Sequence, residues 1–365
     1  MARLSAAPEY DRFAHWPRGA ARALLAATVL LLLAAVWTAP SAAPAPPVAV
    51  VAGPDSAAPE RDTDLQLYDR IAERVGAGEN YYAVAIEEQR ARDFPVRPGL
   101  AVRLPTLAFL SASLGPAGMM VLAAALGIAV LGAWWRRLGE EPGGIDRRVI
   151  AMLLLAIGSL LGLKPHYLAL HEVWAGLLLA LGAGLHRPGR WKAAWLPVAM
   201  ALAIREHALP FVLLLAAMAA WRRDWREAAA WLALAALFAI GLAWHLHTVG
   251  THLLPSDRLS PPWLVFRGLP GWTGNLVEAS VLHLLPVPLA APLALLPLLG
   301  WAGWNSTAGR FHALLLAGDG VLFMLAGRDN NFYWALVVTP AWFVGCAFLP
   351  MALRSVLASA ARARA

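Results

Sequence analysis

The stretch 149–186, VIAMLLLAIGSLLGLKPHYLALHEVWAGLLLALGAGLH, holds two apolar runs on either side of a short polar turn. Both runs are short for a full crossing of a ~30 Å hydrocarbon core at a rise of about 1.5 Å per residue. The turn carries Lys164, His166, His171 and Glu172. Lipid tolerates such groups only where they face a cavity or one another. The stretch therefore predicts two membrane helices whose polar ends meet at a recessed, water-filled cavity.

The rest of the chain has the same character. Of its 365 residues, 59% are hydrophobic and only 15% are charged, and the mean hydropathy is +0.58. Soluble domains do not have this composition. The net charge of +7 does not indicate nucleic-acid binding, because the arginines form small clusters at the ends of apolar runs.

We therefore predict that residues 1–365 form one all-α, polytopic integral membrane domain with about ten transmembrane helices. The predicted spans are 20–38, 106–135, 149–163, 171–186, 193–204, 208–221, 227–247, 281–304, 311–326 and 332–353. One orientation, with the N-terminus inside, places five basic clusters on the cytoplasmic side. These clusters are Arg136/Arg137, Arg147/Arg148, Arg187/Arg190/Lys192, Arg222/Arg223/Arg226 and Arg354/Arg362/Arg364.

The first apolar run has two interpretations. Arg12, Arg18 and Arg22 precede the run Ala23–Val36, and small residues follow at Thr38–Ala45. This pattern is typical of a secretory signal peptide. An uncleaved membrane anchor is our expectation, because many more spans follow.

Two long outer segments, 39–105 and 249–280, separate the predicted spans. In the first, apolar residues at helical spacing predict an amphipathic helix from Asp62 or Thr63 to the glycines at 76 and 78. A second helix is expected from Asn80 to about Arg92. Both helices are expected to lie along the membrane surface.

Asp62 and Asp64 stand one residue apart at the start of the first of these helices. Acidic residues favour a helix N-terminus, and Thr63 with Gln66 fits a capping box. Both aspartates therefore have a structural interpretation. A carboxylate just outside the membrane can also serve as a general base.

The segment 62–109, DTDLQLYDRIAERVGAGENYYAVAIEEQRARDFPVRPGLAVRLPTLAF, contains in order Asp-Leu-x-x-Tyr, Gly-Glu-x-Tyr-Tyr and Arg-x-Pro-Thr. This order resembles the first outer loop of GT-C glycosyltransferases, and is most similar to their bacterial, mannosyltransferase-like branch. Such enzymes take a sugar from a polyprenyl-phosphate carrier on the outer face of the membrane. The resemblance implies that an acidic residue of this loop is the catalytic base, with Asp64 preferred over Asp62.

Sugar transfer also needs cations, because charge grows on the leaving phosphate. The guanidinium group of Arg suits phosphate through its bidentate fork. Basic residues on the outer side violate the positive-inside bias, so they need an anionic partner, which is either phosphate or a protein carboxylate. The candidates for the donor phosphate are Lys164, Arg205, Arg328, Arg103 and Arg97. The candidates for orienting the substrate are Glu172, His166, Glu206, His207 and Tyr82.

No cofactor is expected. Cys346 is the only cysteine, so a disulfide framework and a cysteine-based metal site are excluded. His245, His247 and His252 have no carboxylate at ligand spacing, and a divalent metal is not indicated.

The sequence thus favours an inverting glycosyltransferase of a bacterial inner membrane, with its site on the periplasmic side. Its expected partners are a polyprenyl-phosphate-linked sugar, a lipid or envelope-glycan acceptor and membrane lipids. Two alternatives stay open. One is a secondary transporter, in which ionisable groups must continue into the cytoplasmic half. The other is a non-catalytic membrane assembly protein.

Overall fold

The computed structural model describes residues 10–39, 63–140, 144–160 and 164–362. Within these ranges the chain is helical and forms no strand. The helices of the N-terminal half are α1 (Arg18–Thr38), α2 (Thr63–Gly76), α3 (Tyr81–Ala91), η1 (Gly99–Ala101), α4 (Thr106–Gly139), α5 (Gly144–Leu160), η2 (Pro165–Tyr167) and α6 (His171–Leu185). The helices that follow are α7 (Lys192–Ile204), η3 (Glu206–Ala208), α8 (Leu209–Trp221), α9 (Trp225–Gly250), α10 (Gly268–Glu278), η4 (Val281–Leu284), α11 (Val287–Gly303), α12 (Thr307–Leu325), η5 (Asp329–Val337), α13 (Thr339–Trp342), η6 (Phe343–Ala347) and α14 (Leu349–Ala361).

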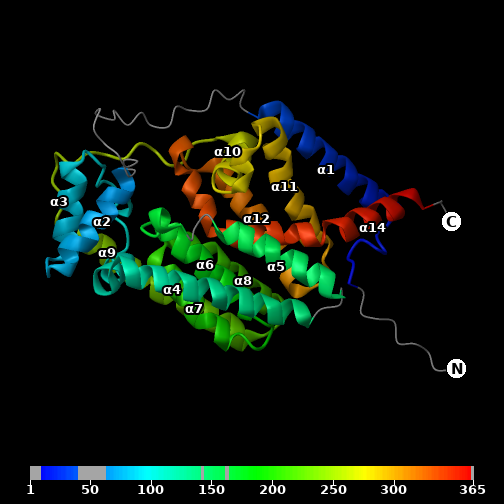
Figure 1. Ribbon diagram of the computed structural model, residues 1–365, viewed down its shortest axis with the longest axis horizontal. Coiled ribbons are helices and arrows are strands. Elements are labelled where there is room, and N and C mark those ends of the chain that lie inside the picture. Colours follow the sequence, from blue (N-terminus) through cyan, green and yellow to red (C-terminus); the bar gives the residue numbers. More distant parts are fainter. Residues whose placement is uncertain (1–9, 40–62, 141–143, 161–163, 363–365) are drawn as a thin grey trace.

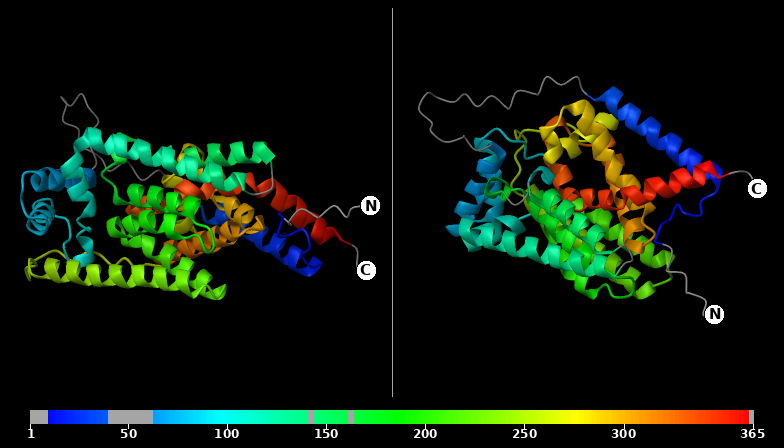
Figure 2. Two further views of the ribbon diagram at one scale, coloured as in Figure 1. Left: turned by 90° about the horizontal axis from the view of Figure 1, so that it is seen from below. Right: turned by 45° about the vertical axis from the view of Figure 1, so that its right-hand side comes forward.

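The helices form an elongated bundle. The long helices α4 and α9 run along its long axis, and α2 and α3 lie across one end (Figures 1 and 2). Helices α1 and α14 pack against each other at the opposite end (Figure 1). We call the end that carries α2 and α3 the cavity end. We call the opposite ends of the inner helices, where α4, α6 and α8 finish and α9 and α12 begin, the far end.

Among the described residues, four helices are long and apolar enough to cross a membrane. They are α1, α9, α12 and the segment Gly99–Gly139, which contains α4. A fifth span results if the bent pair Thr339–Ala347 and Leu349–Ala361 counts as one. Four shorter apolar helices lie at His171–Leu185, Lys192–Ile204, Glu206–Trp221 and Val287–Gly303. The chain is therefore an all-α protein of membrane type. The number of about ten crossings stays a prediction.

Helix α6 explains the apolar stretch with which the sequence analysis began. Nearly all of its residues are buried, including Glu172 and Trp174. A Cβ atom on Gly176 would lie 2.2 Å from the carbonyl oxygen of Leu336, so only glycine permits this contact with η5. Because α6 lies inside the bundle, apolar residues surround it on all sides.

Two predicted spans are broken in the structure. The run 332–353 was expected to be one helix, but it consists of η5, α13, η6 and α14, with a bend of 52° between the last two straight parts. Pro350, at the start of α14, has no N–H to donate to the preceding turn. Helix α4 is interrupted at Gly115, whose φ of 63° and ψ of 177° are not helical. Pro116 follows directly, and a residue before proline is disfavoured in the α region.

The two helices predicted in the first outer segment are confirmed. Helix α2 ends at Gly76, and α3 begins after Asn80, whose side chain accepts hydrogen bonds from the backbone N–H groups of Tyr82 and Ala83. They share a small apolar core with the start of α4 and the end of α9. The second long segment packs against them, since Arg90 of α3 forms an ion pair of 2.6 Å with Asp257. The start of the second outer segment, around Asp257, therefore lies beside α3 at the cavity end.

Candidate functional site

A cavity of about 1200 Å³ lies inside the cavity end. We call it the main cavity. Its walls come from α2, the first half of α4, the turn before α6, η3 and η5. Seven of the predicted site residues line it: Asp64, Arg103, His166, Arg205, Glu206, His207 and Arg328. These residues are far apart in the sequence, and the fold brings them together.

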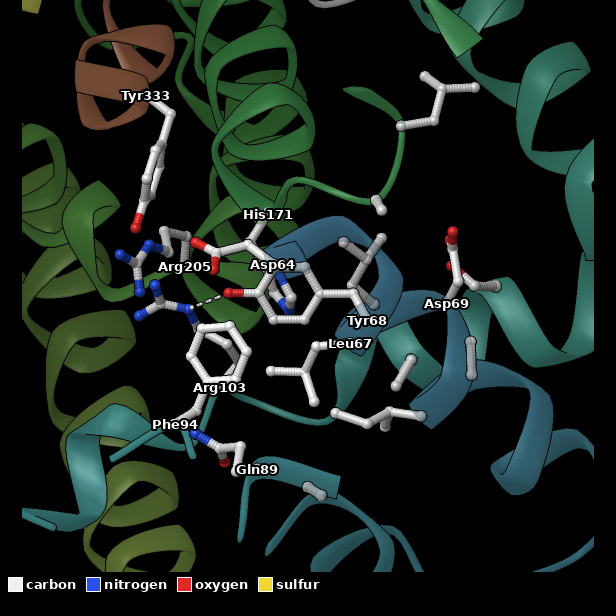
Figure 3. A pocket seen from close by; sticks show the side chains of 18 of the residues that line it. Asp64, Leu67, Tyr68, Asp69, Gln89, Phe94, Arg103, His171, Arg205 and Tyr333 are labelled. Atoms are coloured by element: carbon white, nitrogen blue, oxygen red, sulfur yellow. Dashed lines mark hydrogen bonds between the residues drawn. The ribbon is translucent and has the colours of Figure 1, made fainter. Parts of the chain in front are cut away.

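Asp64 reaches the main cavity because of its position on α2. Leu67, Tyr68 and Ile71 follow at helical spacing on the same face, and all three also line the main cavity. Leu67 and Ile71 are buried, which fixes how α2 faces the bundle. Figure 3 shows the carboxylate of Asp64 on the side where Arg103 and Arg205 gather, whereas Asp69 lies on the other side.

Arg103 is held beside Asp64 by two tyrosines. Its Nε donates a hydrogen bond of 3.1 Å to the hydroxyl oxygen of Tyr68, drawn in Figure 3. Its backbone carbonyl accepts a hydrogen bond of 2.5 Å from the hydroxyl of Tyr81. Burial raises the pKa of Tyr68, an effect that Glu172 and Asp64 strengthen and Arg103 opposes. Tyr68 is thus a neutral hydroxyl at physiological pH and remains a hydrogen-bond donor.

Arg205 is the most enclosed of the cations. Its side chain is 1% exposed, and its Nε lies 2.8 Å from Oε1 of Glu172, which is 2% exposed. Its Nη1 donates a hydrogen bond of 2.6 Å to Glu206. Two carboxylates therefore balance this guanidinium group. The sequence left open whether phosphate or a protein carboxylate neutralises Arg205. In the structure, protein carboxylates take this role.

Arg103 and Arg328 differ from Arg205 in this respect. Within the described residues, neither has a carboxylate at ion-pair distance. Arg328 precedes η5, where its backbone N–H donates to Oδ1 of Asn331 at 3.0 Å. Nη2 of Arg328 lies 3.5 Å from the hydroxyl of Ser260, on the loop from the second outer segment. These two guanidinium groups are the cations of the main cavity that a bound anion would neutralise.

Aromatic and amide groups surround Arg328. Asn331 donates through Nδ2 to the hydroxyl of Tyr333 at 3.1 Å. The ring of Trp334 lies edge-on to His207, with their centroids 4.6 Å apart. All of these side chains line the main cavity. Hydroxyl, amide and aromatic groups of this kind suit the hydroxyls and ring faces of a sugar.

The remaining wall of the main cavity is apolar and belongs to α4. It consists of Leu107, Ala108, Ala112, Met119 and Met120, on both sides of the break at Gly115 and Pro116. The main cavity therefore combines a charged part with an apolar part. Such a cavity fits a ligand with a polar head and an apolar chain.

The structure places the other predicted site residues elsewhere. Glu172 lies behind Arg205 and holds it. Lys164 is exposed and does not line the main cavity. Arg97 donates to the carbonyl of Pro255 at 3.1 Å, outside the main cavity. Tyr82 is buried against His245, whose Nδ1 lies 3.3 Å from its hydroxyl. Asp62 lies outside the described residues.

Sequence reasoning assigned no role to Tyr68, although it is the tyrosine of the Asp-Leu-x-x-Tyr motif. Its contact with Arg103 could have been inferred only from the fold, because the two residues lie on different elements. For metals, the described part of the chain contains no group of three or more His, Cys, Asp or Glu residues arranged to hold an ion. His245 is hydrogen-bonded instead, with Nε2 3.1 Å from the carbonyl oxygen of Val102.

Comparison of the chain with known protein families, with characterised proteins and with solved structures finds no match. The function must therefore be argued from the residues of the main cavity.

Proposed function

We propose that the chain is an inverting glycosyltransferase of the GT-C type in a bacterial inner membrane. It takes a sugar from a polyprenyl-phosphate carrier at the periplasmic face and transfers it to a lipid or envelope-glycan acceptor. The observation that carries this proposal is that Asp64, Arg103 and Arg328 line one cavity together with an apolar wall of α4. A lipid-linked sugar phosphate needs all three features in one place.

In this mechanism the carboxylate of Asp64 accepts the proton of the attacking acceptor hydroxyl. The hydroxyl oxygen forms a bond to the anomeric carbon as the bond from that carbon to the phosphate oxygen breaks. The electron pair stays on the phosphate, where Arg103 and Arg328 stabilise the growing charge. A single displacement with one base and no covalent nucleophile inverts the anomeric carbon.

The roles of the other residues follow from their contacts. Glu172 and Glu206 hold Arg205 in place, so Arg205 shapes the main cavity and contributes positive potential rather than serving as the main phosphate ligand. Tyr68 orients Arg103. His166, His207 and Tyr333 lie where they can contact the sugar.

A secondary transporter is the second candidate, and one observation favours it. Asp319, in the middle of α12, is a buried acidic residue in a candidate span. Transporters place such residues near the midplane of the membrane. An assembly protein gains no comparable support, because it needs no enclosed cavity with buried charges.

The first test is a comparison of envelope lipids and glycans between a strain that lacks the chain and one that expresses it. We expect a missing mass of one hexose or pentose in the strain that lacks it. Identical envelope glycans in both strains would contradict the proposal.

The second test measures the binding of undecaprenyl phosphate to the purified protein in detergent. Replacing a charged hydrogen-bond donor costs about 1.5–3 kcal/mol, so we expect Arg103→Gln to weaken binding about 10- to 150-fold. Lys164→Gln is the matched control, since it also removes one positive charge but lies outside the main cavity. Equal binding by both variants would exclude Arg103 as a phosphate ligand.

A further inference from the structure

Two small cavities lie inside the bundle beyond the main cavity. The first, of about 20 Å³, is lined by His207, Asp319 and His312 among apolar residues. We call it the middle cavity. The second, of about 10 Å³, is lined by His312, Arg137, His186 and Arg222. We call it the far cavity. His207 also lines the main cavity, so each cavity shares a histidine with the next.

Asp319 is the central residue of this series. It is 8% exposed and lies in α12, which is apolar and long enough to span a membrane. Within the described residues, no group lies at hydrogen-bond or ion-pair distance from its carboxyl. Its only titratable neighbours in the middle cavity are His207 and His312. An acidic residue in such a place is costly, and chains retain it chiefly where it has a function.

The two histidines are fixed in orientation by their neighbours. His312 lies seven residues before Asp319, which puts both on one face of α12 and about 10 Å apart along the axis. Its Nδ1 donates to the carbonyl of Ala308 at 2.8 Å, so the neutral ring offers Nε2 as an acceptor. The ring stacks on Trp301 with centroids 4.2 Å apart. The ring of His207 instead lies edge-on to that of Trp334, with centroids 4.6 Å apart.

The series reaches the surface at the far end. His186, in the far cavity, lies with Nε2 2.7 Å from Oε1 of Glu227. Oε2 of Glu227 accepts a bond of 3.1 Å from Arg222, whose side chain is 26% exposed. At the other end, His207 lies 3.7 Å from Glu206 in the main cavity. Ionisable groups therefore extend from one end of the bundle to the other, which the sequence analysis did not foresee.

The volumes of the two small cavities suit water. A cavity needs about 10–15 Å³ to hold one water molecule. The middle cavity has room for one, and the far cavity lies at the limit for one. A water molecule in either cavity would lie among the ionisable groups that line it.

We infer that the chain conducts protons between the main cavity and the far end through His207, Asp319 and His312. Each step breaks one N–H or O–H bond and forms one at the next group or water, so no further reactant is needed. The charged groups that face the path are Arg103, Arg205 and Glu206 at the main cavity, and Arg137, Arg222 and Glu227 at the far end. The inference does not rest on sugar transfer, because proton flux can be measured without a donor.

The test uses purified full-length protein in liposomes that enclose a pH-sensitive dye. A potassium diffusion potential, set with valinomycin and inside negative, drives protons inward. We expect acidification faster than in protein-free vesicles. Asp319→Asn, which is nearly isosteric and cannot release a proton, should return the rate to that of protein-free vesicles.

Two matched controls separate loss of the path from damage to the fold. Asp224→Asn keeps the N-cap of α9, because asparagine caps as well as aspartate. His283→Gln removes an exposed histidine and is compared with His312→Gln. Both controls should retain the flux, and His312→Gln should lose it even if Asp319→Asn does not fold. Absence of flux in the unaltered protein, or full flux in His312→Gln, would overturn the inference.

Discussion

Both ends of the bundle contain buried arginine, histidine and glutamate side chains, but only the cavity end surrounds them with open space. At the far end, Glu227 is fully buried and accepts hydrogen bonds from His186, Arg222 and the backbone N–H of Gly189. Arg137 donates there to the carbonyl of Ala183 at 3.1 Å. The cavity among these groups has only about 10 Å³. The buried carboxylate of the far end therefore has all its partners within the protein.

At the cavity end, arginine and acidic residues surround about 1200 Å³ of space. The charge of Arg205 is balanced by Glu172 and Glu206, as the charges at the far end are balanced by Glu227. Arg103 has a tyrosine hydroxyl as its side-chain partner, and Arg328 has a serine hydroxyl at 3.5 Å. The difference teaches that burial and charge do not by themselves mark a binding site. What marks it is a cation that lines an open cavity and has no protein carboxylate at ion-pair distance within the described residues.

The largest expected effect belongs to Asp64. If it is the general base, Asp64→Asn should lower the transfer rate per folded enzyme by about 10²–10⁴-fold. The amount of folded protein should hardly change, because asparagine is nearly isosteric and also suits a helix start. The rate is measured with a polyprenyl-phosphate sugar and a membrane-extract acceptor.

Asp69→Asn is the matched control for this change. Asp69 lies on the same helix and lines the same cavity, but on the side away from Arg103 and Arg205 (Figure 3). We expect its effect to be milder. A near-normal rate for Asp64→Asn would remove the distinction between the two aspartates and leave Asp64 as a helix-start residue.

The second largest expected effect is a loss of stability on removal of the buried carboxylate at the far end. Glu227→Ala leaves His186 and Arg222 without their shared carboxylate, and breaking a buried pair costs about 3–5 kcal/mol. Unfolding in detergent should show this loss. The protein that stays folded should still bind undecaprenyl phosphate normally.

A surface pair at the same end provides the control. Glu140 lies 2.6 Å from Arg187 and its side chain is 54% exposed. An exposed pair contributes about 0–1 kcal/mol, so Glu140→Ala should be nearly neutral. If the two variants lose equal stability, Glu227 does not stabilise the far end in the way described above.

Much of the fold could be predicted from the sequence. The apolar runs and their Arg-rich ends indicated the helices, and the glycines and Asn80 indicated the limits of α2 and α3. The breaks in the last predicted span could not be derived from hydropathy. They depend on Pro350 and on the close approach of Gly300 to Gly345, where a Cβ atom would lie 1.8 Å from a carbonyl oxygen.

The candidate site was predictable only in part. The predicted outer position of Arg103, Arg205 and Arg328 identified them as residues that need a partner. The partner of each arginine depends on packing between elements that are distant in the sequence. The sequence alone therefore could not identify Glu172 as the partner of Arg205. Asp319 was missed because a single aspartate hardly changes the hydropathy of a long apolar run.

The smallest expected effect concerns the contact between the two outer segments that close the cavity end. Asp257 accepts hydrogen bonds from Nε of Arg90 at 2.6 Å and from the backbone N–H of Leu254 at 2.7 Å. The hydrogen bond from Arg90, together with that of Leu254, holds the pKa of Asp257 below its ordinary value. The contact therefore stabilises the fold fully above the ordinary aspartate pKa of about 4. That contribution is lost as the pH falls through the lowered pKa of the folded state.

Asp257→Asn should thus lower stability at pH 7 by about 1 kcal/mol, the upper range for a partly exposed pair. At a pH below the lowered pKa, the unaltered protein and the variant should unfold alike, because the carboxylate is then protonated in both states of the unaltered protein. Thermal unfolding in detergent at neutral and acidic pH measures both values. Asp93→Asn is the control, since its pair with Arg258 is exposed and should contribute nothing measurable. The stability difference between Asp257→Asn and the unaltered protein could instead persist unchanged in acid. That result would show that the asparagine disturbs packing, and that the ion pair with Arg90 does not hold the two outer segments together.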